Sequence, residues 1–196
     1  MPNPNANIVI GAIIKSERFK ESDLRITALT PHGKTTLYAK GTTKPTSKLK
    51  GALQLFNLIE FTTIGQNITG AHIITSNIGI TRDINRYNLA CYVCQTSSQV
   101  QDHSSETFAL LIQTLGLLAD TEVSCFKIYI WFYSGLLQNL GFGIEEFTHS
   151  PAIEKFTLTG AEELDTIPLT LSIAKECISA IIKNFAEQID IKIPKI

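Results

Sequence analysis

The chain has 196 residues, 44% of them hydrophobic, and a formal net charge of -1 at pH 7, which together indicate a globular protein with one sizeable core or two small domains. The longest apolar stretch, 123–140, is interrupted by Lys127, and the first apolar run, 8–14, lacks the flanks of a secretory signal. We therefore expect a cytoplasmic protein with no membrane partner.

Five predicted strands occupy the first 75 residues. Their β-branched and apolar residues alternate with polar ones, and turn residues such as Gly33 separate them. The predicted strands cover residues 7–15, 24–28, 34–40, 53–64 and 68–75. No intervening helix is long enough to join parallel neighbours. This pattern predicts a five-stranded Greek-key barrel of the OB-fold type, which binds oligonucleotides through strands 2 and 3 and the flanking loops.

The loop predicted after the third strand is strongly basic. It reads YAKGTTKPTSKLKG from Tyr38 to Gly51 and holds four lysines and no acid. Because like charges repel, such a run suits a negative partner better than plain solvent. Residues 1–72 contain nine Lys or Arg against four Asp or Glu, while residues 73–196 contain eight against fourteen. We interpret this division of charge as a basic N-terminal module that faces nucleic acid, joined to an acidic second module.

From Arg82 onward the apolar residues repeat with the period of a helix. The predicted elements are an apolar stripe at 108–118, a central helix capped by Thr121 that runs to Leu140 before Gly141, one short strand at 156–159, and a last helix that begins near Thr170. The central helix is apolar nearly all round, which predicts a place in the middle of a bundle. The expected fold class is α+β, with an OB barrel in residues 1–79 and a helical bundle in 80–196.

The strand predicted at 34–40 carries the first candidate site. The two-residue period of a strand places Lys34, Tyr38 and Lys40 on one side and Leu37 on the other. If Leu37 faces the core, an aromatic ring stands between two ammonium groups on the open face. Proteins that bind single strands use this pairing, and each stacked base contributes roughly 1 to 3 kcal/mol. The alternative is an exposed tyrosine whose lysine neighbours protect the sheet from edge pairing.

A loop expected at 15–20 repeats the mixture of cations and one aromatic residue, although Glu17, Glu21 and Asp23 lie within it or beside it. With the basic loop, these residues form a candidate track along one face of the barrel. The predicted nucleic-acid-binding residues are Lys15, Arg18, Phe19, Lys20, Arg25, Lys34, Tyr38, Lys40, Lys44, Lys48 and Lys50. The cations are expected to contact phosphates, and Tyr38 and Phe19 to stack on bases.

The sequence contains no catalytic pattern. Cys91 and Cys94 form a C-x-x-C pair, but it falls within a predicted helix and lacks a second ligand pair, so packed core thiols are expected there and at Cys125 and Cys177. Nucleotide-binding, serine-nucleophile and zinc-protease motifs do not occur, and the histidines show no general-base pattern. We therefore expect no catalytic residue, no metal and no cofactor, in a protein that is not an enzyme.

Several short motifs follow one another in the first third of the chain: Glu21-Ser22-Asp23, Thr30, Gly33-Lys34, Ala39-Lys40-Gly41 and SKLKGALQLF from Ser47 to Phe56. In this order they resemble the N-terminal OB domain of the RecO recombination mediators, and LLQNLGFG at 136–143 is similar to the end of that family's central helix. The resemblance implies binding of single- and double-stranded DNA, annealing of complementary strands, and loading of RecA together with RecR and single-strand binding protein.

Three departures from the family pattern limit what the resemblance implies. Thr42-Thr43-Lys44 stands where relatives often have arginines, and residues 145–167 lack the cysteines of the zinc site found in many relatives. Ile130-Trp131 replaces basic residues that in some relatives help to hold the acidic tail of single-strand binding protein. This tail contact therefore has less support than DNA binding. Two alternatives stay open: a scaffold whose barrel docks a partner protein, and an RNA-binding OB protein, because lysine reads phosphate and not the sugar.

Overall fold

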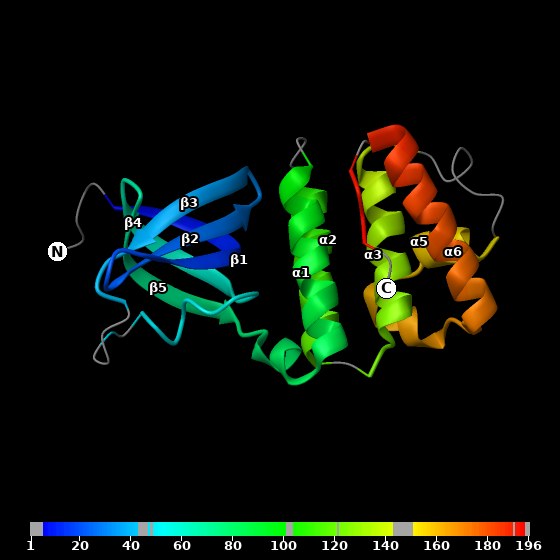
Figure 1. The fold of residues 1–196 in the computed structure, drawn as a ribbon, viewed down its shortest axis with the longest axis horizontal. Coiled ribbons are helices and arrows are strands. Elements are labelled where there is room, and N and C mark those ends of the chain that lie inside the picture. The colour runs from blue at the N-terminus through cyan, green and yellow to red at the C-terminus, as the bar shows by residue number, and fades with distance from the viewer. Residues whose placement is uncertain are drawn as a thin grey trace. The chain divides into compact units, whose positions relative to one another are not determined.

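The computed structural model describes residues 6–42, 47, 49–100, 104–120, 122–142, 151–189 and 191–194. The chain divides into two compact units, residues 1–79 and residues 80–196. Figure 1 shows that the first unit is built from strands and the second from helices.

Five strands close into a barrel in the order β1-β2-β3-β5-β4 (Figure 1). The strands are β1 (Asn7–Phe19), β2 (Asp23–Thr30), β3 (Gly33–Ala39), β4 (Leu58–Ile64) and β5 (Asn67–Thr75). Neighbouring strands pair antiparallel, except that β3 meets β5 in a parallel pairing of Tyr38 with Asn67. A closed five-stranded barrel followed by helices confirms the predicted fold class.

The alternation of side chains along each strand fills the barrel. Ile26, Leu37 and Phe61 are buried and pack in one apolar cluster, and full burial of such a side chain contributes roughly 1.5 to 3 kcal/mol. The segment 49–57 between β3 and β4 forms turns, and the side chains of its Ala52 and Leu53 join the same cluster. The predicted strand start at Leu53 is therefore wrong, because the apolar residues there pack into the barrel core from a turn.

Strand β1 is longer than predicted. It continues to Phe19, which pairs with Asp23 of β2, so the loop expected at 15–20 is wrong. The register between the two strands shifts between Ile13 and Lys15, where β1 has a bulge. Beyond the bulge, Glu17 is the register partner of Arg25, and this pair of opposite charges favours continued strand pairing.

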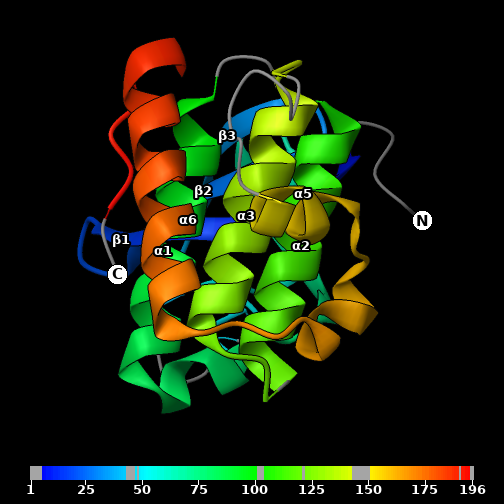
Figure 2. The ribbon, with the colours of Figure 1, turned by 90° about the vertical axis from the view of Figure 1, so that its right-hand side faces the viewer.

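The second unit is a bundle arranged around one apolar helix. Its helices are η1 (Ile78–Arg82), which starts at the end of the first unit, α1 (Ile84–Gln99), α2 (Ser105–Asp120), α3 (Cys125–Asn139), α5 (Pro151–Leu158), η2 (Ala161–Thr166), α6 (Leu171–Asn184) and η3 (Phe185–Ile189). Figure 2 shows α3 between α2 and α6, with α5 in front of it. Contacts with α1, α2, α5 and α6 account for the apolar surface of α3 on all sides.

Local residues fix where the helices begin and end. The Ser124 side chain caps α3 by accepting a hydrogen bond from the Lys127 amide, whereas the cap predicted at Thr121 lies outside the described residues. Gly141, at φ 84°, follows the end of α3 as predicted. Thr170 caps α6, again as predicted. No helix in the described part of the chain has the length and hydropathy needed to span a membrane.

The short strand predicted at 156–159 is wrong, because most of this segment is the end of helix α5. In a helix, a threonine hydroxyl can bond to a carbonyl one turn earlier. The Thr157 hydroxyl donates to the Ile153 carbonyl at 2.9 Å, and the Thr159 hydroxyl donates to the Lys155 carbonyl at 2.7 Å. The buried side chains of Ile153 and Phe156 then hold one face of α5 in the bundle.

Candidate nucleic-acid interface

The outer face of β1, β2 and β3 gathers several of the predicted site residues. Glu17, Arg25 and Tyr38 are register partners, so they form one row across the three strands. Their strand neighbours Ile26 and Leu37 point into the barrel core, which turns this row outward. We call the surface made by Lys15, Glu17, Phe19, Arg25, Lys34 and Tyr38 the β1–β3 face.

Two aromatic rings meet on the β1–β3 face. The ring centroids of Phe19 and Tyr38 are 5.1 Å apart, and the ring planes are tilted by 50°, a favourable geometry for an aromatic pair. Phe19 is 38% exposed, and the Lys20 ammonium lies 5.6 Å from the centre of its ring. The face therefore offers a partly exposed ring platform with a cation beside it.

Glu17 pairs with two of the predicted phosphate contacts. Its Oε1 lies 2.7 Å from Lys15 Nζ, and its Oε2 lies 2.6 Å from Arg25 Nη2 and accepts a second hydrogen bond from Arg25 Nε at 3.2 Å. The hydrogen bonds from Lys15 and then Arg25 lower the pKa of Glu17, and the Glu17 carboxylate in turn raises the pKa of Arg25. Lys15 and Arg25, predicted as helpers in phosphate contact, are therefore already bound to a carboxylate.

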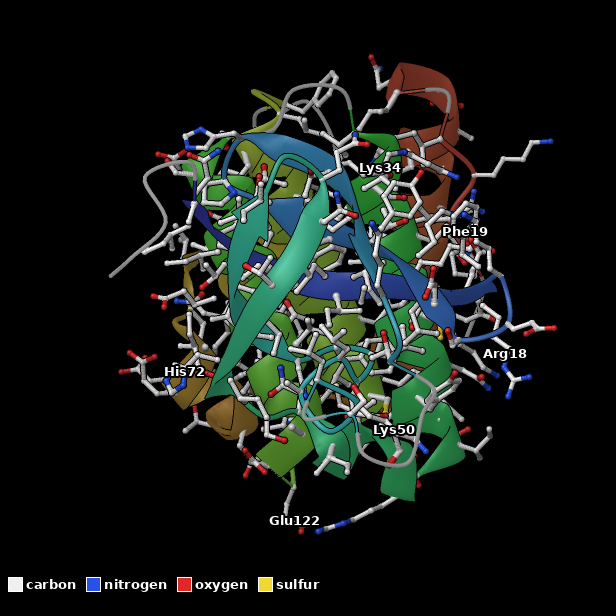
Figure 3. All side chains as sticks on the ribbon, turned by 90° about the vertical axis from the view of Figure 1, so that its left-hand side faces the viewer. Arg18, Phe19, Lys34, Lys50, His72 and Glu122 are labelled. Atoms are coloured by element: carbon white, nitrogen blue, oxygen red, sulfur yellow. The ribbon has the colours of Figure 1, made fainter. Side chains whose placement is uncertain are left out.

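The remaining cations do not all share the β1–β3 face. Arg18 is exposed but lies on the alternate side of β1, in register with Leu24, whose side chain packs against the barrel core. In Figure 3, Lys34, Phe19, Arg18 and Lys50 lie along one side of the view and His72 lies on the other. The exposed cations of the barrel are Lys15, Arg18, Lys20, Arg25, Lys34, Lys40 and Lys50. Lys44 and Lys48 lie outside the described residues.

The first residue of β2 holds the start of the basic loop. Asp23 Oδ1 accepts a hydrogen bond from the Gly41 amide at 2.9 Å, and the Thr42 hydroxyl donates to the Ala39 carbonyl at 2.6 Å. Gly41 has a φ of 67°, a left-handed conformation that glycine adopts without steric cost. These bonds attach the beginning of the basic loop to the end of the hairpin that carries Phe19.

Sequence reasoning missed the parts played by Glu17 and Asp23. The sequence pattern places both within or beside a loop, whereas Glu17 binds two cations and Asp23 anchors the start of the basic loop. A signal was present in the sequence, because Glu17 and Arg25 lie at positions that a longer β1–β2 hairpin would place opposite each other.

The four cysteines are free thiols of the helical bundle. Cys94 and Cys177 are buried, while Cys91 and Cys125 are half-buried. Burial raises the pKa of the Cys91, Cys94 and Cys125 thiols, which keeps them protonated at neutral pH. In the part of the chain that the structure covers, no three histidine, cysteine or acidic side chains cluster in a way that could hold a metal ion.

The closed five-stranded barrel, with its cations and ring pair on the outer surface, defines an OB-fold domain. A family model described as Recombination protein O N terminal matches residues 9–76, which covers nearly the whole barrel. The barrel therefore matches the N-terminal domain of the RecO recombination family, the resemblance that its sequence motifs predicted. No curated protein matches the chain.

Proposed function

We propose that the chain is a DNA-binding and strand-annealing recombination mediator that is not an enzyme, and that acts with RecR and single-strand binding protein to load RecA in DNA repair. One observation carries the proposal: the Phe19 and Tyr38 rings contact each other on a barrel surface that also exposes cations. Rings and cations supply the two interactions that single-stranded nucleic acid needs, base stacking and phosphate contact.

Both interactions are reversible. A base stacked on Phe19 or Tyr38 contributes roughly 1 to 3 kcal/mol to the binding free energy. Each lysine that contacts a phosphate adds an electrostatic contribution, which becomes weaker as the salt concentration rises. A strand held in this way can be exchanged for its complement without covalent chemistry. We expect the lysines of the basic loop, whose start is anchored at Gly41 by Asp23, to add further phosphate contacts.

The proposal is tested by titrating a fluorescent oligothymidylate with the protein at several salt concentrations. If about five lysines each neutralise one phosphate, the logarithm of affinity falls against the logarithm of salt with a slope near -3.5. Replacing Lys44, Lys48 and Lys50 by alanine is expected to flatten the slope by about 2. The matched control replaces the exposed Lys155, Lys175 and Lys183 of the helical unit and is expected to leave the slope unchanged. Equal slopes in the two triple variants would reject the assignment.

Further measurements separate the alternatives. Competition between DNA and RNA oligomers of equal length tests the RNA-binding alternative, and pull-down of RecR with and without nuclease tests the scaffold alternative. Annealing of complementary strands covered by single-strand binding protein tests the mediator role itself. Annealing that is lost in the Lys44, Lys48 and Lys50 variant but kept in the control variant is the expected outcome.

A further inference from the structure

The ion-paired Glu17 on the β1–β3 face suggests how binding at this face is controlled. We propose that the Glu17 carboxylate is an intramolecular competitor of DNA phosphate, which occupies Lys15 and Arg25 in the free protein and keeps the hold on a single strand weak. This inference rests on the proposed function, because it concerns the same face and the same ligand.

The geometry matches that of a phosphate contact. Arg25 directs both Nε and Nη2 at one oxygen of Glu17, at 3.2 Å and 2.6 Å, while Lys15 Nζ lies 2.7 Å from the other oxygen. An arginine fork binds carboxylate and phosphate through the same donors. A phosphate that approaches Arg25 therefore has to displace Glu17 from those donors.

The three side chains are open to a ligand. The exposed fractions are 60% for the Lys15 side chain, 45% for Arg25 and 33% for Glu17. Exposed ion pairs of this kind are weak, so a phosphate can exchange with the carboxylate without unfolding the hairpin. The exchange makes each phosphate contact contribute less to the binding free energy, because the displaced carboxylate remains beside the phosphate and repels it.

The position of Glu17 makes this competition specific to strands that reach the rings. Arg25 is the register partner of both Glu17 and Tyr38, so it lies between the carboxylate and the ring platform. A base stacked on Tyr38 brings its flanking phosphates to Arg25. Asp23, another acid at this end of the hairpin, accepts a hydrogen bond from the Gly41 amide, whereas Glu17 binds Lys15 and Arg25.

The test replaces the carboxylate without changing the size of the side chain. Glu17→Gln frees two cations, each of which adds about -0.7 to the salt slope for single-stranded DNA, so we expect a slope steeper by about 0.7 to 1.4. With equal affinities near 1 M salt, this corresponds to binding about 5- to 25-fold tighter at 0.1 M salt. The probe is the same oligothymidylate.

Glu60→Gln is the matched control. It removes one carboxylate from β4, where Glu60 is the register partner of His72. Figure 3 shows His72 away from Phe19. Both variants change the net charge equally, and their circular dichroism and thermal melting are compared with those of the original chain. Equal binding by the two variants, or weaker binding by Glu17→Gln, overturns the inference.

A second measurement separates occupation by Glu17 from a general effect of charge. Arg25→Ala is made alone and together with Glu17→Gln. The inference predicts a small loss of affinity in the single variant and a larger loss in the Glu17→Gln background; equal losses overturn it. If neither the original chain nor Glu17→Gln binds the oligomer, the proposed function fails and this inference fails with it. If the original chain binds and only the expected difference is missing, the inference alone fails.

Discussion

The Phe19 ring of β1 lies 5.1 Å from the Tyr38 ring of β3, so two strands that are not neighbours in the sheet are joined on their outer side by an aromatic contact. The contact crosses β2 at the position where Arg25 is held by Glu17. The ring pair and the ion pair therefore lie in two adjacent rows of residues on the barrel surface.

Removing either ring is expected to weaken binding of an oligothymidylate. Phe19→Ala or Tyr38→Ala loses roughly 1 to 3 kcal/mol of stacking, which raises Kd by about 5- to 150-fold. Fluorescence anisotropy measures the change. Phe126→Ala is the matched control, because Phe126 is also 38% exposed but belongs to the helical unit. An unchanged Kd in both ring variants would contradict a stacking role.

The conformation of Gly41 gives a prediction for stability. Gly41→Ala forces a side chain into the left-handed conformation at φ 67° and is expected to cost about 1 to 2 kcal/mol of unfolding free energy. Gly51→Ala is the control in the same connecting segment, since Gly51 has open space around it and no positive φ. Urea denaturation is expected to show Gly51→Ala unchanged or up to about 1 kcal/mol more stable. Equal losses in both variants would show that backbone strain at Gly41 is not the cause.

A buried hydroxyl pair in the bundle gives a second prediction for stability. Thr96 Oγ1 and the Tyr133 hydroxyl are 3.1 Å apart and buried. Tyr133→Phe leaves the threonine hydroxyl without this partner, at an expected cost of about 1 to 3 kcal/mol. Thr96→Val in the same chain removes the unsatisfied group and is expected to recover most of the loss. Additive losses in the double variant, measured by chemical denaturation, would contradict direct coupling.

The buried thiols predict a loss of stability at alkaline pH. Burial raises the pKa of the Cys94 thiol, whereas a cysteine in an unfolded chain has a pKa of about 8.5. Below that pH both states hold the proton and the stabilisation is complete; as pH rises above it, the unfolded chain releases its proton first and stability falls. The slope is at most about 1.4 kcal/mol per pH unit for each such thiol.

Cys94→Ala removes one of these thiols and is therefore expected to flatten the dependence of unfolding free energy on pH above about 8.5. Denaturation curves at pH 7 and at several higher values measure the effect, with the original chain as reference. The variant's absolute stability at pH 7 is expected to be lower because the side chain is smaller, so only the slopes are compared. Parallel curves would show that the Cys94 thiol does not titrate in this way.

The barrel could be predicted because each strand is marked by a pattern within its own short segment of sequence. Alternation of apolar and polar residues marked all five strands, and it placed Leu37 inside and Tyr38 outside correctly. The end of β1 and the segment before β4 could not be placed in this way. Glu17 extends β1 by pairing with a residue of the next strand, and Leu53 is apolar because it packs into the core from a turn. The first depends on a pairing across the hairpin and the second on contacts with other strands in the core, and alternation along one strand reveals neither.

The candidate site was predictable in composition but not in pairing. Counting charges identified the basic loop and the cations near Phe19, yet a count treats Lys15 and Arg25 as free when each is bound to Glu17. Helix α5 was missed as well, and there the hydroxyls of Thr157 and Thr159 bond to carbonyl groups one turn earlier in the chain. In each case the partner of a polar atom, rather than the residue type, decides its role.

Tyr38 contributes to the barrel through its main chain as well as through its ring. Its amide donates to the Gln66 carbonyl at 2.8 Å, and its pairing with Asn67 joins β3 to β5 and closes the barrel. The junction that completes the circle of strands thus belongs to the same residue that presents a ring to the outside. A ligand that stacks on this ring would contact the residue that closes the barrel, so we expect a bound strand to make opening between β3 and β5 less frequent.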